Sequence, residues 1–192
     1  MLRPRSLAAL LIFTALTPTN ARAQQSKPPV PAEYAATALG QSGSLAGKNF
    51  GLNIYIDATT SNGDVDEMIA ILKQKGQDGL VSKMEGSKDL GRVAPTGSVG
   101  TGMRFARFRP NKNGGLHIVL ATNRPISLPE LYSRTRSTDY PIGIVTLDVD
   151  KDGKGKGTLA PMCKVKFNKK GELEIENYGQ KPFRLANVYR QK

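Results

Sequence analysis

The sequence predicts an α+β fold, mostly an antiparallel β-meander closing as a barrel or sandwich, with two or three short helices packed on one face. About eight or nine segments alternate apolar and polar residues with the period of a β-strand. Most of them are separated by loops of hairpin length, which favour antiparallel neighbours over parallel ones.

The most regular stretch begins at Tyr140 and predicts three consecutive strands. In residues 144–149 apolar and polar residues alternate, and the return strand ends at Phe167. Asp152-Gly153 supplies the turn between them, because glycine reaches positive φ without a steric penalty. The third strand, 172–176, alternates three glutamates with two apolar residues. We expect those glutamates to face lysines of the return strand, giving a meander with one solvent-facing side.

The remaining elements follow from periodicity and end signals. Further strands are predicted at residues 33–39, 49–58, 90–93, 103–108, 116–122 and 183–189. Val65, Met68, Ile69 and Leu72 form one apolar stripe at helical spacing, with Ser61 or Asn62 as the cap and Gly76 as the end. A second short helix is expected over residues 78–84, and one helical turn at 128–132.

The first 23 residues have the pattern of a signal peptide. Arg3 and Arg5 precede an apolar run over 7–16, and Ala21-Arg22-Ala23 forms a small-residue cleavage pattern. The run is shorter than the roughly 20 residues that span a bilayer. We therefore expect a polar tether over 24–32, a single domain over 33–192 with no transmembrane segment, and a secreted or periplasmic location.

Several short runs resemble a family of uncharacterised secreted bacterial proteins. They read GRVAPTG at 91–97, TNRPIS at 122–127, DYPIGI at 139–144, DKDGKGKG at 150–157 and ENYGQKPFRL at 176–185. The resemblance covers nearly the whole chain from about residue 34 onward. The resemblance implies export and a single domain, and it implies no activity, ligand or binding site for this chain.

The charge balance favours an anionic partner. The formal net charge is +12, and removal of the three arginines in residues 1–23 leaves 12 − 3 = +9. A basic exported protein can adhere to acidic polysaccharide or another anionic surface. The lysines are not interleaved with aromatic residues, so a nucleic-acid partner is not expected. The single cysteine, Cys163, shares the apolar phase of its strand and is expected to be buried.

One irregular segment, residues 123–140, is the predicted binding site. Its candidate ligand-binding residues are Arg124, Tyr132, Arg134, Arg136 and Asp139. Arginine guanidinium groups can donate two parallel hydrogen bonds to a carboxylate, phosphate or sulfate. The alternative is a solvated loop in which the arginines pair with Asp139 and Glu130.

Metal binding and catalysis are not expected. Asp148-x-Asp150-x-Asp152-Gly153 starts like a calcium loop, but the position that needs a bidentate glutamate is Leu159. We therefore interpret it as a hairpin turn, without metal or cofactor. His117 is the only histidine, no G-x-S-x-G motif is present, and the glutamates at 172–176 have the pattern of a solvated strand face.

These patterns favour a secreted, non-enzymatic, β-rich binding or surface-association domain for an anionic ligand. The alternative is a small secreted hydrolase with a dispersed site near His117 or in the 123–140 loop.

Overall fold

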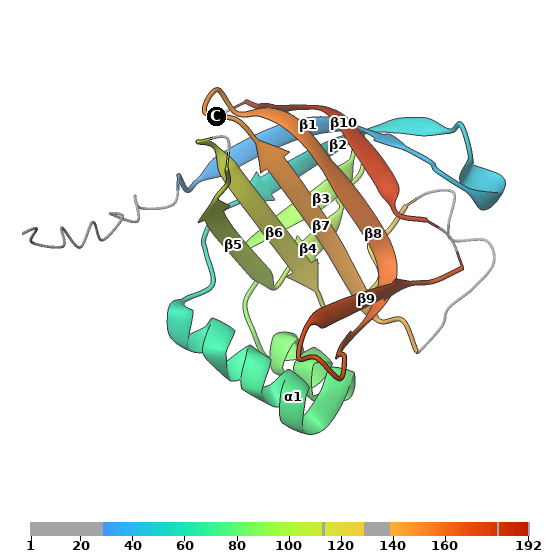
Figure 1. Ribbon diagram of the computed structural model, residues 1–192. Coiled ribbons are helices and arrows are strands. Elements are labelled where there is room, and N and C mark those ends of the chain that lie inside the picture. Colours follow the sequence, from blue (N-terminus) through green and yellow to red (C-terminus); the bar gives the residue numbers. More distant parts are fainter. Residues whose placement is uncertain (1–28, 113, 129–138, 180, 192) are drawn as a thin grey trace, which may run out of the picture.

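The computed structural model describes residues 29–112, 114–128, 139–179 and 181–191 (Figure 1). The strands are β1 (Ala32–Leu39), β2 (Asn49–Ile56), β3 (Gly91–Pro95), β4 (Thr101–Met103), β5 (Phe105–Pro110), β6 (Leu116–Thr122), β7 (Ile142–Val149), β8 (Lys154–Phe167), β9 (Leu173–Asn177) and β10 (Phe183–Arg190). Among the described residues there is one α-helix, α1 (Asn62–Glu85), and one short 3-10 turn, η1 (Gly43–Leu45). The predicted mostly antiparallel α+β class is confirmed.

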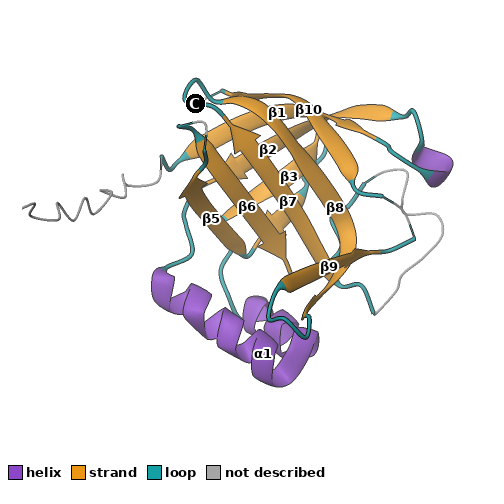
Figure 2. Cartoon of the chain, in the orientation of Figure 1, coloured by secondary structure: helices purple, strands orange, loops and turns teal. Residues whose placement is uncertain are grey.

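The sheet curls into a nearly closed barrel. Its strand order is β4-β3-β2-β1-β10-β8-β7-β6-β5, and β9 pairs with β8 off this path. The two ends of the order, β4 and β5, are consecutive in the chain and are separated only by Arg104. The Arg104 N–H donates to the Ala121 carbonyl of β6 at 2.9 Å. One bent stretch of chain therefore joins the two ends of the sheet. Figures 1 and 2 show the curled shape of the sheet.

Side chains fill the interior of the barrel. Apart from β9, the strands place apolar side chains inside the barrel, most of them at alternate positions, as the period of two requires. The fully buried inward residues include Tyr34, Leu52, Ile54, Ile118, Leu120, Val145, Leu147, Leu159 and Leu185. Ile126 and Leu128 belong to the same cluster, although they follow β6 in the irregular segment.

The buried position of Leu128 changes the interpretation of the segment after β6. The Ile126 N–H donates to the Pro161 carbonyl at 2.9 Å, and the Ser127 N–H donates to Thr101 Oγ1 at 3.1 Å. Residues 125–128 are not helical. They complete the core instead of starting the predicted helical turn, because two apolar side chains gain more from burial than from an exposed turn. Residues 129–132 of that turn lie outside the described residues.

Helix α1 packs across the outer surface of the sheet with its predicted apolar stripe. Ser61 Oγ accepts a hydrogen bond from the Asp64 N–H at 3.1 Å, which confirms the cap. Buried residues of α1 contact a second apolar cluster on β7 and β8. Gly76 has φ +67° and ψ −163°, so the helical path is interrupted at the predicted end. The chain resumes the helix at once, and the two predicted helices form one kinked element.

The far end of β8 leaves the barrel and forms a hairpin with β9, here called the arm (Cys163–Asn177). Its cross-strand pairs include Lys164 with Glu176 and Lys166 with Glu174, as predicted. The expected meander with one solvent-facing side is wrong for β9. Its apolar residues Leu173 and Ile175 are 52% and 44% exposed, because α1 contacts β8 and does not extend over β9.

Cys163 lies beneath α1 at the base of the arm. Its side chain is fully buried, which confirms the prediction, and its thiol donates to the Ile142 carbonyl at 3.2 Å. Burial raises the pKa of the thiol to about 12, because the thiolate would lose its hydration. No helix in the described part of the chain is long and apolar enough to cross a membrane.

Candidate anion-binding face

The structure describes two of the five predicted site residues. Arg124 is exposed directly after β6, and Asp139 is exposed before β7. Asp139 Oδ2 lies 3.8 Å from Lys164 Nζ of the arm, and its carbonyl accepts from Gln77 Nε2 at 3.2 Å. The other three, Tyr132, Arg134 and Arg136, lie outside the described residues.

The end of the predicted binding segment is attached to the arm. The Tyr140 hydroxyl donates to a carboxylate oxygen of Glu176, and the Tyr140 ring meets the Tyr178 ring edge-on at 4.9 Å. The pKa of Tyr140 is raised chiefly by that hydrogen bond to Glu176. Lys164 Nζ lies 4.4 Å from the centre of the Tyr140 ring. These contacts engage Lys164 and Glu176 within the protein and fix the position of Tyr140.

A different surface carries cations that are not used internally. The outer residues Arg109, His117, Asp148 and Lys156 stand in register across β5, β6, β7 and β8. A second row runs Arg107, Val119, Thr146, Thr158 and Arg184, ending on β10. Lys154 and Tyr189 form a further cross-strand pair on the same outer surface. We call the surface formed by Arg109, His117, Asp148, Lys154, Lys156, Arg184 and Tyr189 the open face.

His117 and Asp148 form the central contact of the open face. The distance between His117 Nδ1 and Asp148 Oδ1 is 2.7 Å, and their side chains are 38% and 49% exposed. His117 lies in β6, within the strand predicted over 116–122, and its side chain is on the outer surface. Thr146 Oγ1 and Thr158 Oγ1 lie 2.7 Å apart and bond to each other. No serine of the described chain is bonded to His117, so this contact lacks the nucleophile of a Ser-His-Asp set.

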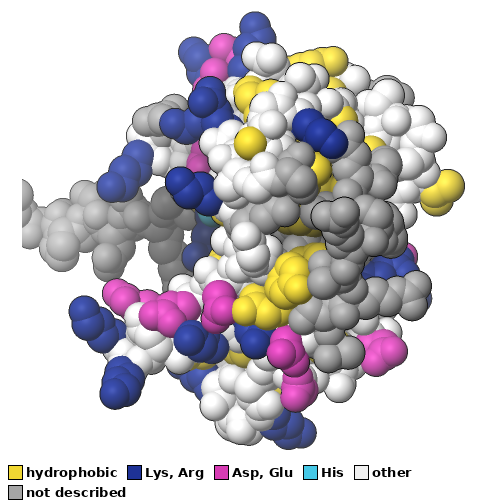
Figure 3. Space-filling view, turned by 90° about the vertical axis from the view of Figure 1, so that its right-hand side faces the viewer, with side chains coloured by type: hydrophobic (Ala, Val, Ile, Leu, Met, Phe, Trp, Pro, Cys, Tyr) yellow, Lys and Arg dark blue, Asp and Glu magenta, His cyan; other side chains and the backbone are white. Residues whose placement is uncertain are grey.

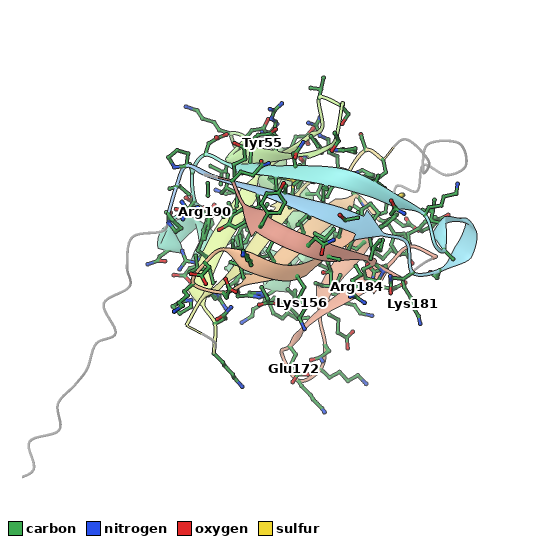
Figure 4. The ribbon with its side chains drawn as sticks, turned by 90° about the horizontal axis from the view of Figure 1, so that it is seen from above. Tyr55, Lys156, Glu172, Lys181, Arg184 and Arg190 are labelled. Atoms are coloured by element: carbon green, nitrogen blue, oxygen red, sulfur yellow. The ribbon has the colours of Figure 1, made fainter. Side chains whose placement is uncertain are left out.

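Four cations of the open face are exposed and have no ionic partner. Within the described ranges, no carboxylate oxygen lies within 4.0 Å of Arg109, Lys154, Lys156 or Arg184. The only acidic side chain of the face, Asp148, is bonded to His117. Figure 4 shows Lys156 and Arg184 on neighbouring strands, and Figure 3 shows Lys and Arg side chains gathered along one edge of the upper half of the molecule. The face therefore has a local excess of positive charge.

Sequence reasoning did not find this surface, because every candidate binding residue that it proposed lies in the 123–140 segment. In the structure Lys154 and Lys156 belong to β8 and, two residues apart, share one side of that strand. Arg184 joins them only because β10 pairs with the first half of β8, with Thr158 opposite Arg184. The two segments are far apart in the sequence, and no local pattern sets that register.

The aspartates near the face form a turn, as predicted. Asp150 Oδ1 accepts hydrogen bonds from the Asp152 and Lys154 N–H groups, both at 2.9 Å. This is an Asx-type arrangement, in which the carboxylate satisfies donors of the hairpin. The structure holds no group of three His, Cys, Asp or Glu residues placed to bind a metal ion within the ranges described above.

A scan against protein-family models, a search of curated proteins and a search of solved structures each found no match.

Proposed function

We propose that the protein binds an acidic polysaccharide through the open face. The observation that carries this proposal is the set of four exposed cations, Arg109, Lys154, Lys156 and Arg184, without a carboxylate within 4.0 Å in the described chain. Neighbouring strands lie about 4.8 Å apart, so the cations form a two-dimensional array on a rigid sheet. A polymer with repeated carboxylate or sulfate groups can contact several of them at once, and each contact adds to the avidity.

The chemistry of the face favours a saccharide over a nucleic acid. Tyr189 is 47% exposed in the pair with Lys154, and its ring offers one flat apolar surface beside the cations. Single-stranded nucleic acids are bound by several aromatic rings that stack on successive bases. Among the residues that define the open face, Tyr189 alone has a phenyl-type ring on which a base could stack. The predicted export of the chain is consistent with a polymer outside the cytoplasm.

The test compares variants that remove equal charge from different places. Lys156→Ala with Arg184→Ala removes two cations from the open face. Lys169→Ala with Lys170→Ala removes two exposed lysines from the turn of the arm. On heparin, the first variant should elute at clearly lower salt than the second, because only the first loses clustered contacts. Arg134→Ala with Arg136→Ala tests the loop that the sequence predicted.

Three results would contradict the proposal. Equal losses from all three double variants would mean that only net charge matters. A loss confined to Arg134→Ala with Arg136→Ala would move the site to the 123–140 segment. Unchanged retention of Lys156→Ala with Arg184→Ala would exclude the open face. Melting temperatures of the variants provide the control for folding.

A second candidate function, hydrolysis, is favoured by the 2.7 Å contact between His117 and Asp148. A carboxylate on Nδ1 orients an imidazole so that Nε2 can accept a proton. Hydrolysis of ester or glycoside substrates that is abolished by His117→Ala, but retained by Lys156→Ala with Arg184→Ala, would favour this function over binding.

A further inference from the structure

Strand β9 has one edge that pairs with β8 and one edge that is open. The Asn168 N–H donates to the Glu172 carbonyl at 2.9 Å, and the Tyr178 N–H donates to the Met162 carbonyl at 3.0 Å. Bonded and non-bonded pairs alternate along an antiparallel ladder. Glu174 and Glu176 therefore direct their backbone groups toward β8, while Leu173 and Ile175 direct theirs away. No described strand pairs with that outer edge.

On the opposite edge of the arm, a side chain of α1 binds one backbone donor of β8. The Val165 N–H points away from β9 and donates to Gln77 Oε1 at 2.9 Å. Gln77 follows the interruption of α1 at Gly76, so its side chain reaches the strand from the kink. A helix side chain thus satisfies the donor on one edge. The donors and acceptors of Leu173 and Ile175 on the other edge have no partner in the described chain.

The two faces of β9 differ in chemistry. Leu173 and Ile175 expose about half of their side chains on one face, and the glutamates at 172, 174 and 176 occupy the other. Figure 4 shows Glu172 at the end of the arm, away from the barrel wall. Asn177 continues the apolar face, and its Oδ1 is buried without a hydrogen-bond partner in the described structure. The edge therefore presents backbone groups, two apolar side chains and an acidic row.

The charges of β9 select the kind of strand that can pair with it. A second copy of β9 in antiparallel pairing would place glutamates opposite glutamates, which is destabilising. β8 shows the pattern that does pair with β9, because Lys164 and Lys166 face Glu176 and Glu174. Lys166 Nζ lies 3.6 Å from Glu174 Oε2. A strand with the same alternation of basic and apolar residues fits the open edge in the same way.

We propose that β9 binds an extended segment of another protein by strand addition. In this segment Lys or Arg alternates with apolar residues. Its apolar residues lie opposite Leu173 and Ile175, where they cover the exposed side chains. Its basic residues lie opposite the glutamates on the other face. The proposal is independent of the open face, whose positive charge repels such a segment.

The experiment uses labelled synthetic heptapeptides and fluorescence anisotropy with the full chain. The basic peptide reads Thr-Lys-Val-Lys-Val-Lys-Thr, and its matched control replaces each lysine by glutamate. The basic peptide should bind saturably and the acidic peptide should not. Ile175→Pro removes a donor from the open edge and no bond to β8, so it should weaken binding about tenfold. Lys156→Ala with Arg184→Ala should leave peptide binding unchanged.

Two N-methylated peptides keep the test decisive if Ile175→Pro fails to fold. The valines of the basic peptide direct their N–H groups to β9, so methylation of both valine nitrogens should weaken binding about tenfold. Methylation of the backbone nitrogens of two lysines should have little effect, because those N–H groups point away from β9. Equal binding of the two N-methylated peptides would overturn strand addition. Equal binding of the basic peptide and its acidic control would overturn it as well. A dimer in solution that Ile175→Pro dissociates would assign the edge to a second copy and overturn the proposed partner.

Discussion

The two halves of β8 carry the same kind of sequence and have opposite surroundings. Lys154 and Lys156 alternate with glycines in the barrel wall, and neither has a carboxylate within 4.0 Å in the described chain. Lys164 and Lys166 alternate with apolar residues in the arm and face two glutamates. Asp148 of β7 stands opposite Lys156 but is bonded to His117, whereas Glu174 and Glu176 of β9 face the arm lysines. The two ends of one strand therefore differ in the acidic partners that are left for their lysines.

The largest expected difference between the two regions concerns their stability. Leu159 is fully buried in the barrel, whereas Leu173 of the arm is 52% exposed. Leu159→Ala should lower the free energy of unfolding by about 2–5 kcal/mol, because it removes buried methyl groups and leaves a cavity. Leu173→Ala should lower it by less than about 0.5 kcal/mol. Urea denaturation followed by circular dichroism measures both values, and similar losses would mean that the arm contributes to the core.

The free energy of unfolding should depend on alkaline pH through Cys163, which lies in β8 where the barrel wall meets the arm. Burial raises the pKa of the Cys163 thiol from its ordinary value of 9.0 to about 12. The unfolded chain therefore loses this proton first, and the stabilising contribution is complete below pH 9 and declines as the pH rises toward 12. Relative to Cys163→Ala, the native protein should lose about 1.4 kcal/mol per pH unit in this window. A parallel pH dependence of the two proteins would place the thiol in contact with solvent.

The smallest expected effect concerns the paired charges of the arm. Lys166 and Glu174 lie 3.6 Å apart with side chains 63% and 48% exposed. Water screens such a pair, so a double-mutant cycle with both alanine variants should give a coupling free energy below about 0.5 kcal/mol. A coupling well above that value would mean that the glutamates hold the arm together and are not available to a partner strand.

Local sequence patterns were sufficient for most elements of the fold. The strand predicted at 116–122 has those bounds, and the cap at Ser61 and the interruption at Gly76 are present. These features depend on residues within one turn or one strand, where alternation, capping and positive φ act directly. The cross-strand pairs of the arm were also predictable, since a short loop sets their register.

Contacts between distant segments could not be read from the sequence. The closure of the sheet through Arg104, the insertion of Leu128 into the core and the pairing of Arg184 with Thr158 each depend on packing across the barrel. The candidate site moved for the same reason. The sequence indicated the irregular segment with Arg134 and Arg136, whereas the cations that the structure brings together lie on regular strands.

The pairing of β10 has a consequence for the synthesis of the protein. β10 lies between β1 and β8, and the Gln191 N–H donates to the Glu33 carbonyl at 2.7 Å. β1 is the first of the described strands to be synthesised, and its second edge is covered only after residues 183–190 have been made. During translation this edge of β1 stays uncovered until residues 183–190 emerge from the ribosome. Such late closure suits a chain that is threaded through a translocation channel before it folds, as its first 23 residues predict.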